Sequence, residues 1–97
     1  MNEIAQKSPL ERAVGLVGGQ SELARRVSER VGRRVRQGTL WKWLRPGARV
    51  PTEDGIVLAI EAITRDVATG RGEPELAVTR HELRPDVYGH RPERIAA

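Results

Sequence analysis

The chain has 97 residues, yet it contains no cysteine, no phenylalanine and only three aromatic residues. The absence of cysteine excludes disulfide bonds, catalytic thiolates and the cysteine ligand sets of zinc fingers. The scarcity of aromatic residues disfavours a protein that binds single-stranded RNA by stacking bases on its side chains. RNA binding therefore remains only a rival interpretation for any basic surface on this chain.

Long apolar runs are also missing. No stretch approaches the ~20 apolar residues that a membrane-spanning helix requires. The first ten residues lack the basic and then apolar pattern of a secretion signal. We therefore expect a cytoplasmic protein that does not associate with a membrane.

Reactive side chains are sparse. The only histidines are His81 and His90, and nothing near them completes the three or four ligands of a metal site. The sequence has no phosphate-binding loop of the Walker type, and Gly18-Gly19 is typical of a helix end. We expect no enzymatic activity, no catalytic residue, no metal and no cofactor.

Positive charge is concentrated in one half of the chain. Residues 1–50 contain eleven Lys and Arg against four Glu, whereas residues 51–97 contain six Arg against nine acidic residues. The net charge is thus +7 in the first half and −3 in the second. Such a bias indicates a nucleic-acid partner, although a GC-rich coding background would also enrich arginine.

The length and the 38% hydrophobic content predict one domain with a small core. Ser8-Pro9-Leu10-Glu11 forms a capping box with proline at the first helical position, so a helix should begin there and end at Gly18-Gly19. Its apolar stripe consists of Leu10, Ala13, Val14 and Val17.

The segment from Gln20 to Leu44 contains two amphipathic helical patterns and the densest positive charge. The first pattern ends at Gly32, and its buried stripe would consist of Leu23, Ala24, Val27 and Val31. The second pattern would bury Leu40, Trp43 and Leu44. Its opposite face is basic and amide-rich, which predicts a helix-turn-helix that binds a DNA groove.

The second helix of this pair, Arg36 to Leu44, is expected to read bases in the major groove. Gln can pair with an adenine edge and Arg or Lys with a guanine edge, while a glycine lets the backbone approach. The predicted base-reading residues are Arg36, Gln37, Gly38, Thr39, Trp41 and Lys42. For Trp41 the alternative is partial burial against the following loop.

Phosphate contacts are expected around this helix, at the start of the first helix and in the flanking loops. The predicted residues are Gln20, Ser21, Arg33, Arg34, Arg45 and Arg49. Two alternatives stay open. Ser21 could simply cap its own helix, and the arginines could form a solvated turn.

Beyond the loop, Thr52 is expected to cap a helix that runs to about Ala68, with Glu53 and Asp54 at its positive end. Gly70 to Glu75 is typical of a loop. Thr79 opens a second capping box and a single-turn helix that Pro85 should end. The apolar residues Leu76, Val78, Leu83, Val87 and Tyr88 should pack on their own domain or on a second copy of the chain.

The stretch QSELARRV at Gln20 resembles the first helix of the Cro/C1-type helix-turn-helix pair. The blocks SPLERAV, LVGGQSELARRV, VRQGTLWKWL, RVP, AIEAIT and AVTRHELRPDVYG are similar to phage Cro-like and YdaS-type antitoxin regulators, from Ser8 to Gly89. The resemblance implies an all-helical repressor-like fold and a C-terminal dimer contact. The connection between the two helices is about six residues longer than the usual turn, so we expect an extra helical turn, a corner at Gly32–Arg34 and Val35 in the core.

These observations predict an all-α bundle of about five helices with a short C-terminal extension. The expected parts are an N-terminal arm (1–7), a helix-turn-helix domain (8–69), a packing or dimerisation segment (70–89) and a disordered tail (90–97). The expected function is that of a dimeric phage or prophage repressor that occupies a double-stranded DNA operator. The alternative is an antitoxin-type module that masks a toxin or another protein partner.

Overall fold

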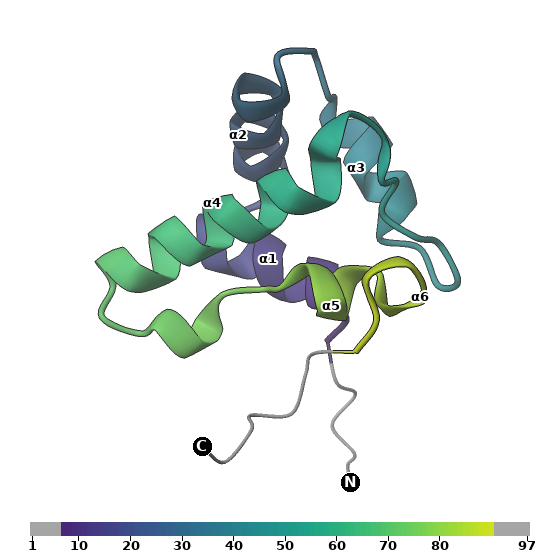
Figure 1. Cartoon of the computed structure of the whole chain (residues 1–97). Helices are drawn as coiled ribbons and strands as arrows, with labels where there is room; N and C mark the ends of the chain where they lie inside the picture. The colour runs from purple at the N-terminus through teal and green to yellow at the C-terminus, as the bar shows by residue number, and fades with distance from the viewer. Residues whose placement is uncertain (1–6, 91–97) are drawn as a thin grey trace, which may run out of the picture.

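The computed structural model describes residues 7–90, and this part of the chain is all-helical, as the sequence predicts. It has six α-helices rather than about five, together with two 3-10 turns, and it contains no strand between residues 7 and 90. The elements are α1 (Pro9–Val17), α2 (Gln20–Val31), α3 (Gln37–Trp43), η1 (Glu53–Gly55), α4 (Ile56–Gly70), η2 (Pro74–Leu76), α5 (Arg80–Leu83) and α6 (Pro85–Tyr88). Figure 1 shows the long helix α4 running across α1 and α2, with α3 at one side.

The start and the end of α1 confirm the sequence prediction. The Ser8 hydroxyl accepts a hydrogen bond from the Glu11 amide (3.1 Å), and the Glu11 carboxylate accepts one from the Ser8 amide (2.7 Å). The helix ends where Gly18 adopts a left-handed conformation. Leu10, Ala13 and Val17 of the expected stripe are buried, and Val14 is partly buried, where α1 packs against α4 and α2.

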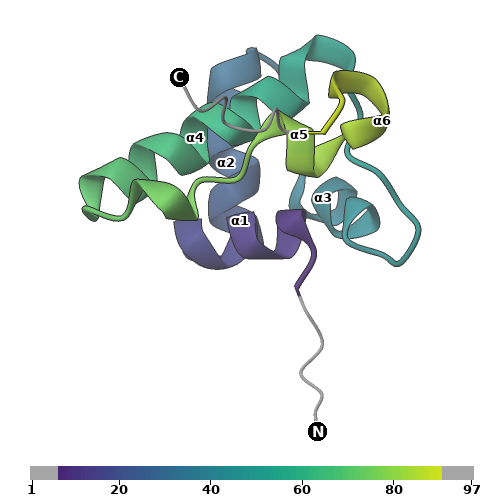
Figure 2. The same cartoon turned by 60° about the horizontal axis from the view of Figure 1, so that its bottom comes forward.

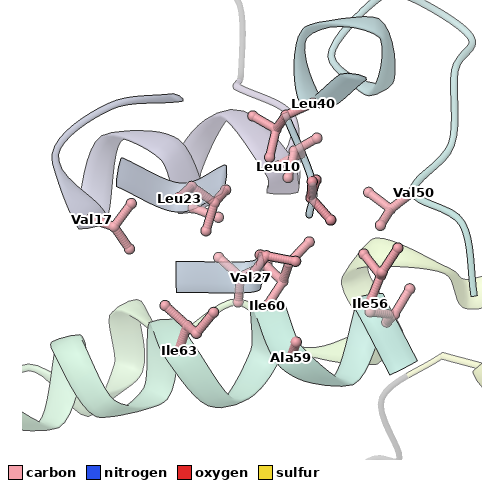
Figure 3. Close-up of a cluster of buried hydrophobic side chains, with 14 residues drawn as sticks. Leu10, Val17, Leu23, Val27, Leu40, Val50, Ile56, Ala59, Ile60 and Ile63 are labelled. Carbon is pink, nitrogen blue, oxygen red and sulfur yellow. The ribbon is translucent and has the colours of Figure 1, made fainter. Parts of the chain in front are cut away.

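A single apolar core joins the first four helices. Figure 3 shows Leu10, Leu23, Leu40 and Ile60 converging from α1, α2, α3 and α4, respectively. Val50, in the loop after α3, closes the cluster beside Ile56 (Figure 3). The other buried apolar members of the cluster are Ala13, Val17, Val27, Val35, Val57, Ala59, Ile63 and Val78.

The beginning of α4 differs from the prediction. Thr52 makes no side-chain capping bond, and the helix begins at Ile56 and runs to Gly70. Asp54 (φ 59°, ψ 14°) and Gly55 (φ 74°, ψ 24°) instead have the left-handed dihedral angles of a type I′ turn. Two successive left-handed residues cannot belong to an α-helix, so they separate Thr52 from α4.

The C-terminal segment packs on its own domain. The Thr64 hydroxyl, in α4, accepts a hydrogen bond from the buried Val78 amide (3.0 Å). The Glu61 carboxylate accepts hydrogen bonds from the Arg80 amide (3.0 Å) and the Arg80 Nε (2.9 Å). These bonds hold residues 78–80 against α4, close to α1 and α5 in both views (Figures 1 and 2).

The Thr79 capping box is confirmed, because the Thr79 hydroxyl accepts from the Glu82 amide and the Glu82 carboxylate accepts from the Thr79 amide. Pro85 follows α5, as predicted, but it also begins the one-turn helix α6. A proline at the first helical position loses no needed hydrogen bond. This helix is the additional element that the sequence analysis did not predict.

The five apolar residues proposed for packing or dimerisation separate into two groups. Val78 is fully buried, and Leu83 and Tyr88 are partly buried against the core. Only Leu76 and Val87 are exposed, with 38% and 51% of their surface accessible. Of the predicted N-terminal arm and C-terminal tail, all but Lys7 and His90 lie outside the described residues.

Candidate nucleic-acid interface

The helix pair α2–α3 has the predicted long connection. α2 extends to Val31, and Gly32 ends it in a left-handed conformation, with its amide bonded to the Ser28 carbonyl (3.0 Å). Val35 then enters the core with 5% of its surface exposed. The extra turn, the corner and the core position of Val35 all agree with the sequence analysis.

Ser28 fixes the start of α3, and the sequence analysis missed it. Its hydroxyl accepts a hydrogen bond from the Val35 amide (2.8 Å) and lies 2.7 Å from the Ala24 carbonyl and 3.0 Å from the Val35 carbonyl. A serine in the last turns of a helix can bond back to the carbonyl four residues earlier. Here the same hydroxyl also bonds to the backbone of Val35, which directly precedes Arg36, the N-cap residue of α3.

α3 turns nearly all of its surface away from the core. Leu40 is its only fully buried residue, whereas Trp43 and the following Leu44 are partly buried, in agreement with their predicted inward positions. Figure 2 shows α3 at the periphery, uncovered by another helix. All six predicted base-reading residues are exposed: Arg36, Gln37, Gly38, Thr39, Trp41 and Lys42.

A side-chain contact joins the starts of α2 and α3. The Ser21 hydroxyl donates a hydrogen bond to the Gln37 Oε1 (2.9 Å). Ser21 does not cap its own helix, because α2 begins one residue earlier, after Gly19, and has no side-chain capping bond. The contact orients the amide of Gln37 and leaves its Nε2 group free to donate.

The predicted phosphate-binding arginines fall into two groups. Arg33 and Arg49 are paired with carboxylates, the first with Asp54 (Nε to Oδ2, 2.6 Å) and the second with Asp86 (2.9 Å). Arg34 and Arg45 are exposed and form no ion pair within residues 7–90, and neither do Arg36 and Lys42. Positive charge that is not balanced by a neighbouring carboxylate is therefore located next to α3.

For Trp41 the sequence left two alternatives open, exposure on the face of α3 and partial burial against the following loop, and the structure has features of both. It is 52% exposed, and the Arg45 guanidinium lies over its ring at 5.3 Å from the centroid. The ring also lines an open groove of about 590 Å³ between α1 and α3, next to Gln20 at the start of α2. Trp41 thus packs against the following loop and still presents a surface to a ligand.

Several other arginines are also held by carboxylates. Hydrogen bonds from Arg25 and Arg26 lower the pKa of Glu22 to about 2. A hydrogen bond from Arg84 likewise lowers the pKa of Asp86 to about 2. Glu22 and Asp86 thus hold these arginines at the surface of the fold.

Residues 7–90 contain no group of three or more histidine, aspartate or glutamate side chains placed to hold a metal ion. No helix in this part of the chain is both long and apolar enough to cross a membrane.

Comparison with known protein families gives one match. The family model described as "Bacterial toxin YdaS" matches residues 10–92, which include every described helix except the first residue of α1. No curated protein and no solved structure gives a significant match to the chain. Because the family model covers most of the sequence, the chain belongs to the YdaS family.

Proposed function

We propose that this YdaS-family protein is a sequence-specific regulator that binds double-stranded DNA through α3. The observation that carries the proposal is the exposed face of α3, where hydrogen-bonding side chains are surrounded by basic residues without carboxylate partners. Elsewhere in the described chain most arginines are ion-paired. An exposed helix with amide and basic side chains has the shape and the chemistry that the major groove accepts.

The proposed contacts follow from the geometry. α3 would lie in the major groove, with Gln37 on an adenine edge and Arg36 and Lys42 on guanine edges. The Ser21 hydroxyl holds Gln37 at the start of the helix, so part of the conformational cost of ordering that side chain is met before binding. Arg34 and Arg45 would bind phosphates on either side of the groove.

The regulatory mechanism proposed here is operator occupancy by a homodimer, as in Cro-like phage and prophage repressors. Two copies would place their α3 helices in successive major grooves about 34 Å apart on a palindromic site. A bound dimer would then exclude polymerase from the promoter. The proposal involves no catalysis, no cofactor and no metal, and it is consistent with a cytoplasmic protein.

The test is a selection from a pool of random duplexes, followed by fluorescence-anisotropy titrations at two salt concentrations. A single-stranded RNA of equal length serves as the control ligand. The proposal predicts enrichment of a palindromic duplex whose preference over random DNA persists at the higher salt concentration. Binding that is weak, independent of sequence and lost with salt would contradict it, and stronger binding to the RNA would favour an RNA-binding function.

The family description favours a second candidate function, in a toxin–antitoxin system. In such a system the chain would act either as an antitoxin-type module that binds a toxin or another protein partner, with or without DNA binding, or as the toxin that the family description names. Leu76 and Val87 are the exposed apolar residues of the C-terminal segment that such a partner could cover. Co-purification of a stoichiometric neighbouring gene product, lost on replacing Val87 by Asp, would support this function, and its absence would leave the DNA-binding proposal alone.

A further inference from the structure

One of the ion pairs at the helix-turn-helix joins two segments that are far apart in the sequence. Arg33 lies in the corner before α3, and Asp54 lies in the turn before α4. Their side chains meet with Arg33 Nε 2.6 Å from Asp54 Oδ2, and both are about half exposed. The neighbouring Arg34 is also exposed but has no carboxylate partner among residues 7–90. Two adjacent arginines therefore present different net charges to a ligand.

The backbone around Asp54 holds the carboxylate in this position. Asp54 is the only residue other than glycine with a positive φ between residues 7 and 90. Together with Gly55 it forms a tight turn, for which Asp-Gly is a favoured sequence. The carboxylate is thus attached to a well-defined turn rather than to a long flexible side chain.

The second paired arginine beside α3 provides a contrast. Asp86 binds Arg49 (2.9 Å) but also receives two hydrogen bonds from Arg84 (2.9 and 2.8 Å). In this cluster two arginines share one aspartate, and Glu53 is also close enough to act on the charge of Arg84. The Arg33–Asp54 pair contains one arginine and one aspartate, and Asp54 forms no ion pair with any other arginine among residues 7–90.

We infer that Asp54 restrains DNA binding by neutralising Arg33 at the edge of the reading helix. The inference rests on the proposed DNA-binding function and adds a regulatory residue to that site. A DNA phosphate has to compete with the Asp54 carboxylate for Arg33, and it also meets the repulsion of that carboxylate. Both effects act on the backbone contact, which carries no sequence information, so they reduce affinity for all duplexes alike.

The decisive variant is Asp54→Asn, because asparagine tolerates the left-handed conformation and changes only the charge. Releasing one arginine for one phosphate should steepen the dependence of log K on log salt by about 0.9. If Asp54→Asn and the wild type bind equally at 1 M salt, this steeper slope corresponds to roughly eightfold tighter binding by Asp54→Asn at 0.1 M salt. The gain should be equal on the selected operator and on a random duplex.

Two controls separate this effect from a general increase in positive charge. Glu75→Gln makes the same change in net charge at an exposed residue of η2, in the turn after α4, which lies at the far end of the molecule from α3 (Figures 1 and 2). Its affinity should change much less than that of Asp54→Asn. Arg33→Ala should weaken the wild-type protein less than Arg34→Ala does, and it should abolish the gain of Asp54→Asn.

The outcomes are distinguishable. Tighter binding by Asp54→Asn that depends on Arg33 supports the inference. Unchanged or weaker binding, a gain matched by Glu75→Gln, or a gain that survives Arg33→Ala overturns it while the DNA-binding function stands. Failure of both wild type and Asp54→Asn to bind any duplex overturns the proposed function and the inference together. Should Asp54→Asn prove unfolded by circular dichroism, equal losses in Arg33→Ala and Arg34→Ala would still overturn the inference.

Discussion

Arginine has two different environments in this molecule. Along α4 and the C-terminal segment, guanidinium groups meet carboxylates, as in the pairs Arg80–Glu61 and Arg71–Glu73. Around α3, Arg34 and Arg36 have no such partner among the described residues. The comparison teaches that the number of arginines does not locate a binding surface. A better guide to a binding surface is the balance between arginines and nearby carboxylates, because only uncompensated charge remains available to a phosphate.

The largest effect is expected on the paired side, for Glu61→Gln. The Glu61 side chain is only 11% exposed and accepts hydrogen bonds from the Arg80 amide and guanidinium. Removing its charge should lower the free energy of unfolding by about 2 kcal/mol, less than for a fully buried pair because Arg80 remains partly solvated. Urea denaturation would measure this, with Glu73→Gln as the surface control. A loss as small as that of the control would show that the pair does not hold the C-terminal segment.

Acid should remove the same contribution. Burial alone would raise the pKa of Glu61, but the hydrogen bonds and the charge of Arg80, together with Arg65, lower it below the ordinary value of 4.5. A carboxylate with a lowered pKa in the folded state stabilises the fold above its unfolded pKa, and the contribution is lost as the pH falls through the folded pKa. The stability difference between wild type and Glu61→Gln should therefore be constant above pH 4.5 and shrink below it. A difference that grows on acidification would contradict this account.

On the α3 side, Gln37→Ala should reduce discrimination between the operator and random DNA. A good base contact is worth roughly 1–3 kcal/mol, and the variant should lose that amount on the operator while its affinity for random duplexes is unchanged. Competition titrations with the two duplexes would measure the difference. Ser21→Ala is the companion variant, since it removes only the group that orients Gln37, and its loss should be smaller. Equal losses on both duplexes would exclude Gln37 from base reading.

The smallest effects should come from single surface arginines, and they should differ between the two sides. Arg34→Ala should weaken binding to operator and random DNA by the same factor, roughly eightfold at 0.1 M salt, and reduce the salt slope by about 0.9. Arg71→Ala removes an exposed pair with Glu73 (3.6 Å) and should change neither DNA binding nor stability by more than about 0.5 kcal/mol. If both variants lost DNA affinity equally, the distinction between paired and unpaired arginines would be wrong.

Local patterns in the sequence predicted most of the fold. There are two capping boxes, which begin at Ser8 and Thr79. Each spans only four consecutive residues, and both appear in the structure as expected. The apolar stripes of the first three helices also bury the expected faces, and Gly32 forms the predicted corner. These features depend on neighbours in the chain, so a single sequence contains the information that fixes them.

Contacts between separate elements of the fold could not be predicted from the sequence. Nothing local indicates that Ser28 would bind the backbone of Val35, or that Glu61 would meet Arg80, because these pairs depend on how the elements pack. The turn at Asp54-Gly55 is different, since Asp-Gly is a recognised turn sequence. The same residues also predict the first turn of a helix, because acidic residues suit that position. At the site, exposure of the predicted base-reading residues followed from helical periodicity, whereas the division of the arginines into paired and free groups did not.

The sparse attachment of α3 also has an evolutionary consequence. Leu40 is the single fully buried side chain of the helix, and Ser28 secures its start from outside the reading face. Substitutions at Arg36, Gln37 or Lys42 should therefore leave the fold intact. If α3 reads DNA as proposed, related proteins would acquire new operators by exchanging a few surface residues, and a library randomised at these positions would allow the same exchange in the laboratory.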